Sequence, residues 1–162
     1  MKGIESDYSG NVMADPTSSL AILGHRYYLH GMYAESAKLF EFVLRHEPTC
    51  SEHYYALGKA LHALKKHDQA INAYMRAIRL GQADAELHFH LGQCLLFLDR
   101  LDEAGHSFET CLRMPGLQHH DASYLKQKAK QLLLLVHRHE KKLGGQKEAL
   151  KTEAFSLSSP QI

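Results

Sequence analysis

Apolar residues across positions 17–118 recur three and four places apart, which is the spacing of one face of an α-helix. The alternation typical of a half-buried strand is missing from this region. The pattern repeats when the chain is shifted by 34 residues, without insertion, over the units 17–50, 51–84 and 85–118. Each unit is long enough for two amphipathic helices joined by a turn. We therefore predict an all-α chain built from three stacked helical hairpins.

Three positions within each unit hold the same kinds of residue in all three copies. The eighth is glycine, the twentieth is small and the twenty-fourth is aromatic. Unit by unit, these residues are Gly24, Ser36 and Phe40, then Gly58, Ala70 and Tyr74, then Gly92, Ala104 and Phe108. We expect the glycine and the small residue to face each other where the two helices of a unit cross, because their lack of bulk lets the helices approach closely. The aromatic ring is expected in the space between the helices. We assign these residues to the repeat core.

The segment 119–143 follows the third unit and has no copy elsewhere in the chain. One face of it carries Leu125, Ala129, Leu132 and Val136. A stack of repeats leaves an apolar end, which a helix with one polar face can cover. We predict a capping helix here, together with a flexible N-terminal segment at 1–16 and a disordered tail at 144–162.

The first helices of such a stack line a concave groove, and the register of the core leaves certain positions facing it. Nine residues form the predicted partner-binding groove: Tyr28, Leu29, Tyr55, Lys59, His62, Phe89, Gln93, Leu96 and Phe97. An aromatic-rich surface of this kind suits the apolar side chains of an extended peptide. Lys59 is the one cation in the set, which disfavours a clamp on a C-terminal carboxylate. The alternative is that some of these rings are buried against the cap or a flanking segment.

The 34-residue period and the Leu-Gly…Ala…Phe/Tyr pattern resemble the tetratricopeptide repeat. The resemblance covers about 102 of the 162 residues. One departure is the fourth position of the unit, often Trp in that family, which is here occupied by Leu20, Tyr54 and His88. The resemblance implies three helix-turn-helix repeats in a right-handed superhelix with a C-terminal capping helix, and a concave surface that binds protein.

Two stretches bear a narrower resemblance. The segments Gly31-Met-Tyr33-Ala-Glu-Ser-Ala-Lys-Leu-Phe40 and Phe89-His-Leu-Gly-Gln-Cys94-Leu-Leu96 are similar to parts of the bacterial type III secretion chaperones of translocator proteins. The resemblance implies a cytosolic chaperone, in protein transport linked to virulence, that holds an apolar segment of a secreted translocator-type client in the groove. It also implies a short peptide lying across Tyr28, Tyr55, His62 and Phe89.

Other functions fit the same fold. One alternative is a structural adaptor or scaffold, and another is a co-chaperone for a secretion needle or filament subunit. A chaperone makes an insoluble client soluble, whereas an adaptor joins proteins that are already stable, so co-expression discriminates between them. That chaperone group often uses a longer N-terminal arm for dimerisation, and about sixteen residues precede the first unit here, so a homodimer stays open.

Composition narrows the class further. Nineteen Lys and Arg against eighteen Asp and Glu give a formal net charge of +1, so no overall basic field favours nucleic acid. The longest apolar run, 132–136, is far shorter than the ~20 residues that span a bilayer, and the first residues do not form a secretory signal. Three cysteines without metal-ligand spacing suit reduced thiols. We expect a cytoplasmic protein that binds a protein client, with no nucleic acid and no stable membrane insertion.

Candidate catalytic and metal-binding groups are few despite thirteen histidines. His88 and His90 are two residues apart, as are His137 and His139, which on a helix separates each pair by about 200° and keeps it from sharing an ion. The sequence contains no phosphate-binding glycine loop, nucleophile elbow or His-Glu-x-x-His motif. The cysteines within the repeats look like packed thiols. We expect no enzyme, no catalytic residue, no cofactor and no metal site; stoichiometric metal in the purified protein would argue the opposite.

Overall fold

The computed structural model of this chain describes residues 16–82, 84–114 and 120–141. These residues form seven α-helices: α1 (Pro16–Leu29), α2 (Tyr33–His46), α3 (Ser51–Ala63), α4 (His67–Arg79), α5 (Ala85–Phe97), α6 (Leu101–Arg113) and α7 (His120–Lys141). No strand occurs within these ranges, so the all-α prediction is confirmed. Apart from Pro16, the segments predicted to be flexible or disordered, 1–16 and 144–162, lie outside the described residues.

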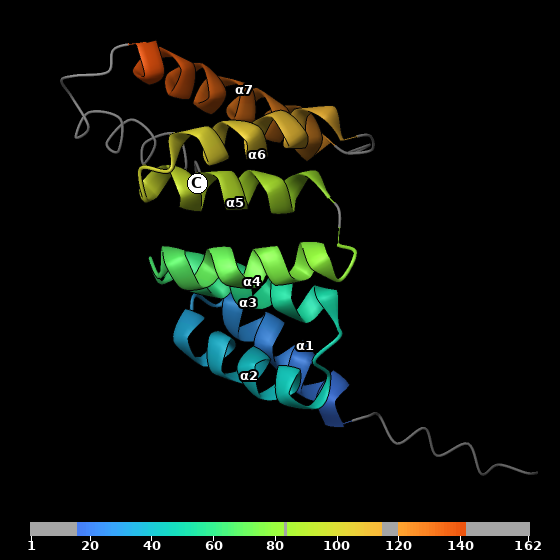
Figure 1. The fold of residues 1–162 in the computed structure, drawn as a ribbon. Coiled ribbons are helices and arrows are strands. Elements are labelled where there is room, and N and C mark those ends of the chain that lie inside the picture. The colour runs from blue at the N-terminus through green and yellow to red at the C-terminus, as the bar shows by residue number, and fades with distance from the viewer. Residues whose placement is uncertain (1–15, 83, 115–119, 142–162) are drawn as a thin grey trace, which may run out of the picture.

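Three hairpins and a final single helix are stacked in chain order (Figure 1). Helices α3 and α5 begin 34 residues apart, as do α4 and α6, which is the period found in the sequence. Each helix packs mainly on its neighbours in the chain, and α7 packs mainly on α6, where the capping helix is predicted. None of the described helices is long and apolar enough to cross a membrane.

The turn inside each hairpin has the same backbone conformation. Gly31, Lys65 and Asp99 are spaced 34 residues apart, and all have φ between 62° and 74°. In each turn two backbone hydrogen bonds of 2.9–3.1 Å return to carbonyls of the preceding helix, as in a Schellman motif. Glycine adopts this left-handed conformation freely, whereas lysine and aspartate do so at a cost of about 1 kcal/mol. The hydrogen bonds offset that cost, and the three hairpins are closed alike.

A ring packed against a glycine joins the two helices of each hairpin. A Cβ atom added at the glycine would lie 3.0, 2.5 and 2.6 Å from the ring in the first, second and third hairpin. The pairs are Gly24 with Phe40, Gly58 with Tyr74, and Gly92 with Phe108. All three rings are fully buried, as are Ala70 and Ala104. The interior thus contains the residues predicted for it, with one difference: the ring, and not the small twentieth residue, lies nearest to the glycine.

Helix α7 buries its apolar face at the end of the stack. Ala129, Leu132 and Val136 are at most 1% exposed. A Cβ atom added at Gly105 of α6 would lie 3.5 Å from Val136, which is an ordinary packing distance. The contact between α6 and α7 is therefore close but not overfilled.

Candidate functional site

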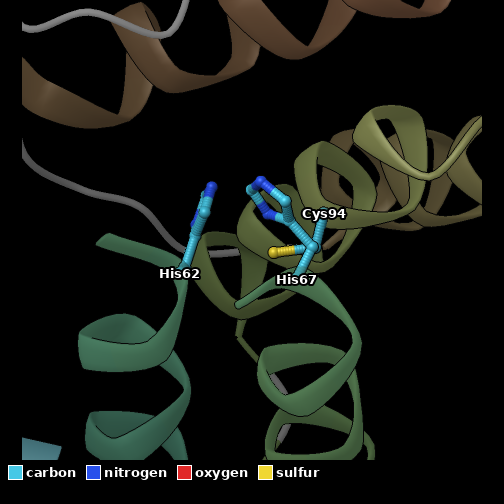
Figure 2. A group of neighbouring side chains, drawn as sticks. All are labelled: His62, His67 and Cys94. Atoms are coloured by element: carbon cyan, nitrogen blue, oxygen red, sulfur yellow. The ribbon is translucent and has the colours of Figure 1, made fainter. Parts of the chain in front are cut away.

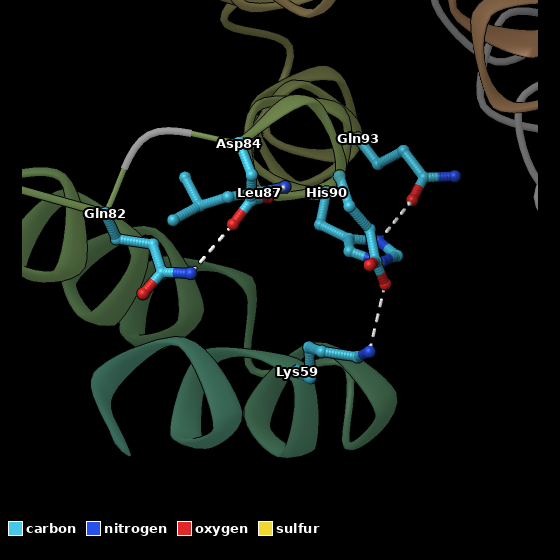
Figure 3. A network of polar contacts seen from close by, with 7 residues as sticks. Lys59, Gln82, Asp84, Leu87, His90 and Gln93 are labelled. Carbon is cyan, nitrogen blue, oxygen red and sulfur yellow. Dashed lines mark hydrogen bonds and ion pairs between the residues drawn. The ribbon is translucent and has the colours of Figure 1, made fainter. Parts of the chain in front are cut away.

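Side chains of α1, α3 and α5 meet in a row that crosses the three hairpins. The Lys59 Nζ atom on α3 lies 5.5 Å from the ring centroid of Tyr28 on α1 and 5.4 Å from that of Tyr55 on α3. The same ammonium donates a hydrogen bond of 3.0 Å to Oε1 of Glu86 on α5. His90 Nε2 lies 3.4 Å from that oxygen. We call these five residues the polar row, and Figure 3 shows Lys59 reaching from α3 toward the side chains of α5.

The ammonium of Lys59 is held by groups of its own fold. Two ring faces and one carboxylate surround it, and 27% of the side chain is exposed. A partly exposed cation–π contact is worth about 0.5–1 kcal/mol, and the charged hydrogen bond adds to it. A partner's carboxylate would have to compete with these contacts for Lys59. This engagement agrees with the prediction that a carboxylate clamp is disfavoured.

The charges of the polar row are set by its internal contacts. The hydrogen bond with His90 is the main cause that lowers the pKa of Glu86 to about 2, burial opposes it, and the charge of Lys59 adds to the lowering. Burial is the main cause that raises the pKa of Tyr28 and of Tyr55 above the usual value of 10.0. At neutral pH the row therefore presents two neutral phenols, an ammonium and a carboxylate.

A cap at the start of α5 positions this row. Asp84 Oδ1 accepts a 2.7 Å hydrogen bond from the Leu87 backbone N–H, and Gln82 Nε2 donates to Asp84 Oδ2 at 2.8 Å (Figure 3). An aspartate in this position stabilises a helix by about 1 kcal/mol. The cap fixes the first turn of the helix that carries Glu86 and His90.

Six of the nine residues predicted to line the groove lie in or near the polar row or on an exposed position, and one of these six, Gln93, is itself buried. Three belong to the row itself: Tyr28, Tyr55 and Lys59. The ring centroid of His62 lies 5.7 Å from that of His90, and Gln93 Oε1 lies 3.2 Å from His90 Nδ1. Leu29, at the end of α1, is 80% exposed. The structure thus brings together side chains from all three first helices.

Three residues predicted to face the groove are instead buried, with exposures of 5%, 5% and 2%: Phe89, Gln93 and Leu96. The reason is the position of α5, which contacts α3, α4, α6 and α7 and is enclosed more fully than α1. The Phe89 ring lies 6.1 Å from that of Phe108 on α6. Their predicted exposure is wrong. The alternative, burial of rings, concerns Phe89 alone among the three, and its ring lies near α6. Phe97 is half-buried and stacks on His67 with ring centroids 4.6 Å apart.

Two groups of neighbouring residues are not predicted from the sequence. The pair Glu86 and His90 is spaced i, i+4 on one helix, a spacing at which side chains interact, and this was the available signal. A second group, His62, His67 and Cys94, comes from three different helices, so no spacing along the chain announces it.

The buried thiols are poor nucleophiles. Burial raises the pKa of Cys94 to about 12 and the pKa of Cys111 to about 11. Both thiols therefore remain protonated at neutral pH, whereas catalytic cysteines have lowered pKa values. This chemistry agrees with the packed-thiol interpretation.

Two family models match the chain. The model described as "TPR repeat" matches residues 58–96, and the model described as "Tetratricopeptide repeat" matches residues 85–115. The chain therefore contains tetratricopeptide repeats, as the 34-residue period predicts.

A curated relative is named as a member of a protein complex. The chain is 32% identical over 97 residues to BBSome complex member BBS4 of Bos taurus, a match that covers 60% of this chain and 18% of the relative. The chain thus spans about a fifth of the length of the curated relatives it matches.

Solved structures share the fold. A type III secretion system complex from Aeromonas hydrophila has a TM-score of 0.72 at 23% identity, covering 82% of this chain and 87% of that chain. The Yersinia enterocolitica type III secretion chaperone SycD, in complex with a peptide of the translocator YopD, has a TM-score of 0.71 at 20% identity, covering 80% and 98%. The described helices share the fold of these structures.

Proposed function

We propose that this chain is a protein-binding repeat module that holds an extended segment of a partner protein along the polar row. One observation carries the proposal: Lys59 joins rings from two adjacent repeats and a carboxylate from the third in a single partly exposed line. The Tyr28 phenol and the paired charges of Lys59 and Glu86 offer both apolar contact and hydrogen bonds to an extended chain, whereas the Tyr55 hydroxyl is buried. Leu29, almost wholly exposed, extends the apolar contact at the end of α1.

The first form of this function is a cytosolic chaperone that holds an apolar segment of a secreted translocator-type client. The shared fold with SycD, whose structure includes a YopD peptide, supports it. A chaperone of this kind shields a segment that is insoluble alone. Its client would therefore accumulate in soluble form only when this chain is present.

The second form is an adaptor within a multiprotein assembly. The identity to BBSome complex member BBS4 supports it, because that relative is named as a subunit of a complex. The burial of Phe89 and Leu96 also supports it, because less apolar surface is then left for an insoluble client than the sequence predicts. An adaptor would join two partners that are each soluble alone.

The test begins with partners captured from the native host and identified by mass spectrometry. Each is then produced with and without this chain, and its soluble fraction is measured. A partner that is soluble only with the chain selects the chaperone, and a partner that is soluble in both cases selects the adaptor.

The binding surface is tested with two matched variants and the purified partner. Tyr28→Ala removes a ring of the polar row, whereas Met75→Ala removes an exposed side chain from an apolar hollow between α4, α5 and α6. We expect Tyr28→Ala to weaken binding by about 2 kcal/mol, the usual loss at an interface anchor, and Met75→Ala to leave it unchanged. The reverse result would place binding in the hollow and refute the polar row.

A further inference from the structure

His62, His67 and Cys94 bring two imidazoles and a thiol to one point between the second and third hairpins. One ligand-type atom from each residue lies within 4.8 Å of the others. Figure 2 shows the Cys94 sulfur pointing toward the gap between the two histidine side chains. His62 comes from the end of α3, His67 from the start of α4 and Cys94 from the last turn of α5.

The fold holds this group in place from several sides. The left-handed turn at Lys65 folds the chain back so that the rings of His62 and His67 lie 5.6 Å apart. Phe97 stacks on His67 with an angle of 7° between the rings, which fixes the plane of the imidazole. Cys94 is fully buried and is a free thiol.

A hydrogen-bonding atom in the group lacks a partner. His67 Nδ1 is buried and has no hydrogen-bond partner among the described residues. A buried polar atom left in this state costs about 1–3 kcal/mol, so native structures rarely leave one without a ligand, a water or a function. The neighbouring His90 differs, because both of its ring nitrogens lie within hydrogen-bond distance of Glu86 or Gln93.

We propose that His62, His67 and Cys94 bind one Zn²⁺ ion. Imidazole nitrogen and cysteine sulfur are the ligands that zinc prefers, and three protein ligands leave one tetrahedral position for a water molecule. Ligand atoms around tetrahedral zinc stand about 3.5 Å apart, so the three side chains need to close by about 1 Å. The Cys94 thiol releases its proton to solvent when the zinc–sulfur bond forms.

The site joins two repeats, and this gives the ion a structural consequence. His62 and His67 belong to the second hairpin and Cys94 to the third, so a bound ion ties the two hairpins together. The inference is independent of the polar row, because none of the three ligands belongs to it. Lys65 is the nearby cation, and it is exposed to solvent, which screens its repulsion of the ion.

A second cluster in the described residues provides the competing hypothesis. Glu47, Cys50 and His53 also have ligand-type atoms within 4.8 Å of one another. There His53 Nδ1 is also buried without a hydrogen-bond partner, but it lies 3.4 Å from a carboxylate oxygen of Glu47, and the Cys50 thiol donates a hydrogen bond to Glu52. The first cluster, whose Cys94 thiol is fully buried whereas Cys50 is half-buried, is the one that we assign.

The experiment uses the full chain, reduced and without a histidine tag, and Co²⁺ as a spectroscopic probe for Zn²⁺. We expect one Co²⁺ per chain, intense visible bands of a tetrahedral site, a thiolate-to-cobalt charge-transfer band, and displacement of all of these by Zn²⁺. Cys94→Ser abolishes the charge-transfer band and weakens Zn²⁺ binding at least about 100-fold, since loss of even an outer hydrogen-bond partner costs 10–100-fold. His67→Gln should weaken Zn²⁺ binding to the same extent, and the side chain that it replaces is only half-buried.

Two variants serve as matched controls. Cys111→Ser removes another buried thiol, and Cys50→Ser removes the thiol of the second cluster, so both keep the charge-transfer band and the affinity. The metal-free variants are compared by circular dichroism, and His67→Gln decides the matter if Cys94→Ser does not fold. Absence of the band in the parent chain, its survival in Cys94→Ser, or its loss only in Cys50→Ser would overturn the proposal.

Discussion

A single methyl group at Gly58 tests how closely the helices of the second hairpin cross. In Gly58→Ala the new Cβ atom would lie 2.5 and 2.6 Å from two ring carbons of Tyr74, about 1 Å closer than an ordinary carbon–carbon contact. The ring has little room to move, because it is fully buried and the rings of Tyr55 and His90 lie 6.0 and 6.3 Å away. Overpacking of this kind costs about 1–3 kcal/mol.

The matched control is Gly105→Ala on α6. Its Cβ atom would meet Val136 at 3.5 Å, which is an ordinary contact, so the gain in helix propensity of about 1 kcal/mol remains. Gly58→Ala has the same gain, which leaves a net loss of up to about 2 kcal/mol. The two variants should therefore differ by about 1–3 kcal/mol in the free energy of unfolding, or about 2–12 °C in melting temperature.

Urea and thermal unfolding, both followed by far-ultraviolet circular dichroism, measure this difference. The expected order of stability is Gly105→Ala, then the parent, then Gly58→Ala. If Gly58→Ala is as stable as Gly105→Ala, the ring does not pack against the glycine and the close crossing of α3 and α4 is refuted.

Two further predictions concern single groups. The hydroxyl of Tyr74 is buried without a hydrogen-bond partner among the described residues. Tyr74→Phe gives the second hairpin the residue type of Phe40 and Phe108, and it should raise the free energy of unfolding, measured in urea, by about 1 kcal/mol. A decrease of similar size would contradict this prediction. The pKa of Glu86 is lowered from 4.5 to about 2, so as the pH falls between these values the unfolded chain takes up the proton first and the folded state loses stability. In a plot of melting temperature against pH, Glu86→Gln should flatten the curve between these two pH values. Glu41→Gln, on an exposed position of α2, should leave the shape of the curve unchanged. Identical curves for the two variants would show that Glu86 does not contribute to the pH dependence of stability.

The hairpins could be predicted from the sequence because their contacts repeat. The pairing of a glycine with a ring sixteen residues later recurs in all three units, so the sequence constrains each helix crossing three times. The left-handed turns also recur at equivalent positions of the three units. Lysine and aspartate rarely adopt this conformation, but Lys65 and Asp99 stand in register with Gly31, and that alignment was the available signal.

The surroundings of α5 could not be predicted in this way. Tyr55 and Phe89 hold equivalent positions, yet Tyr55 is half-buried and Phe89 is 5% exposed. Helix α5 also contacts α7, which has no counterpart in the repeat, so a comparison of equivalent positions does not include this neighbour. The His62, His67 and Cys94 group was missed for a related reason, since a search for ligands along one helix does not find three helices that meet in space.

The order in which the helices contact one another has a consequence for how the chain opens. Among the described helices, α1 contacts only α2 and α3, and α7 contacts only α5 and α6. Stability in such a linear array is a sum of terms from each unit and each junction, so partial unfolding starts at an end and need not reach the middle. Amide hydrogens of α1 and α7 should therefore exchange faster than those of α3 to α5. The contacts are also short in sequence, which is typical of chains that fold rapidly.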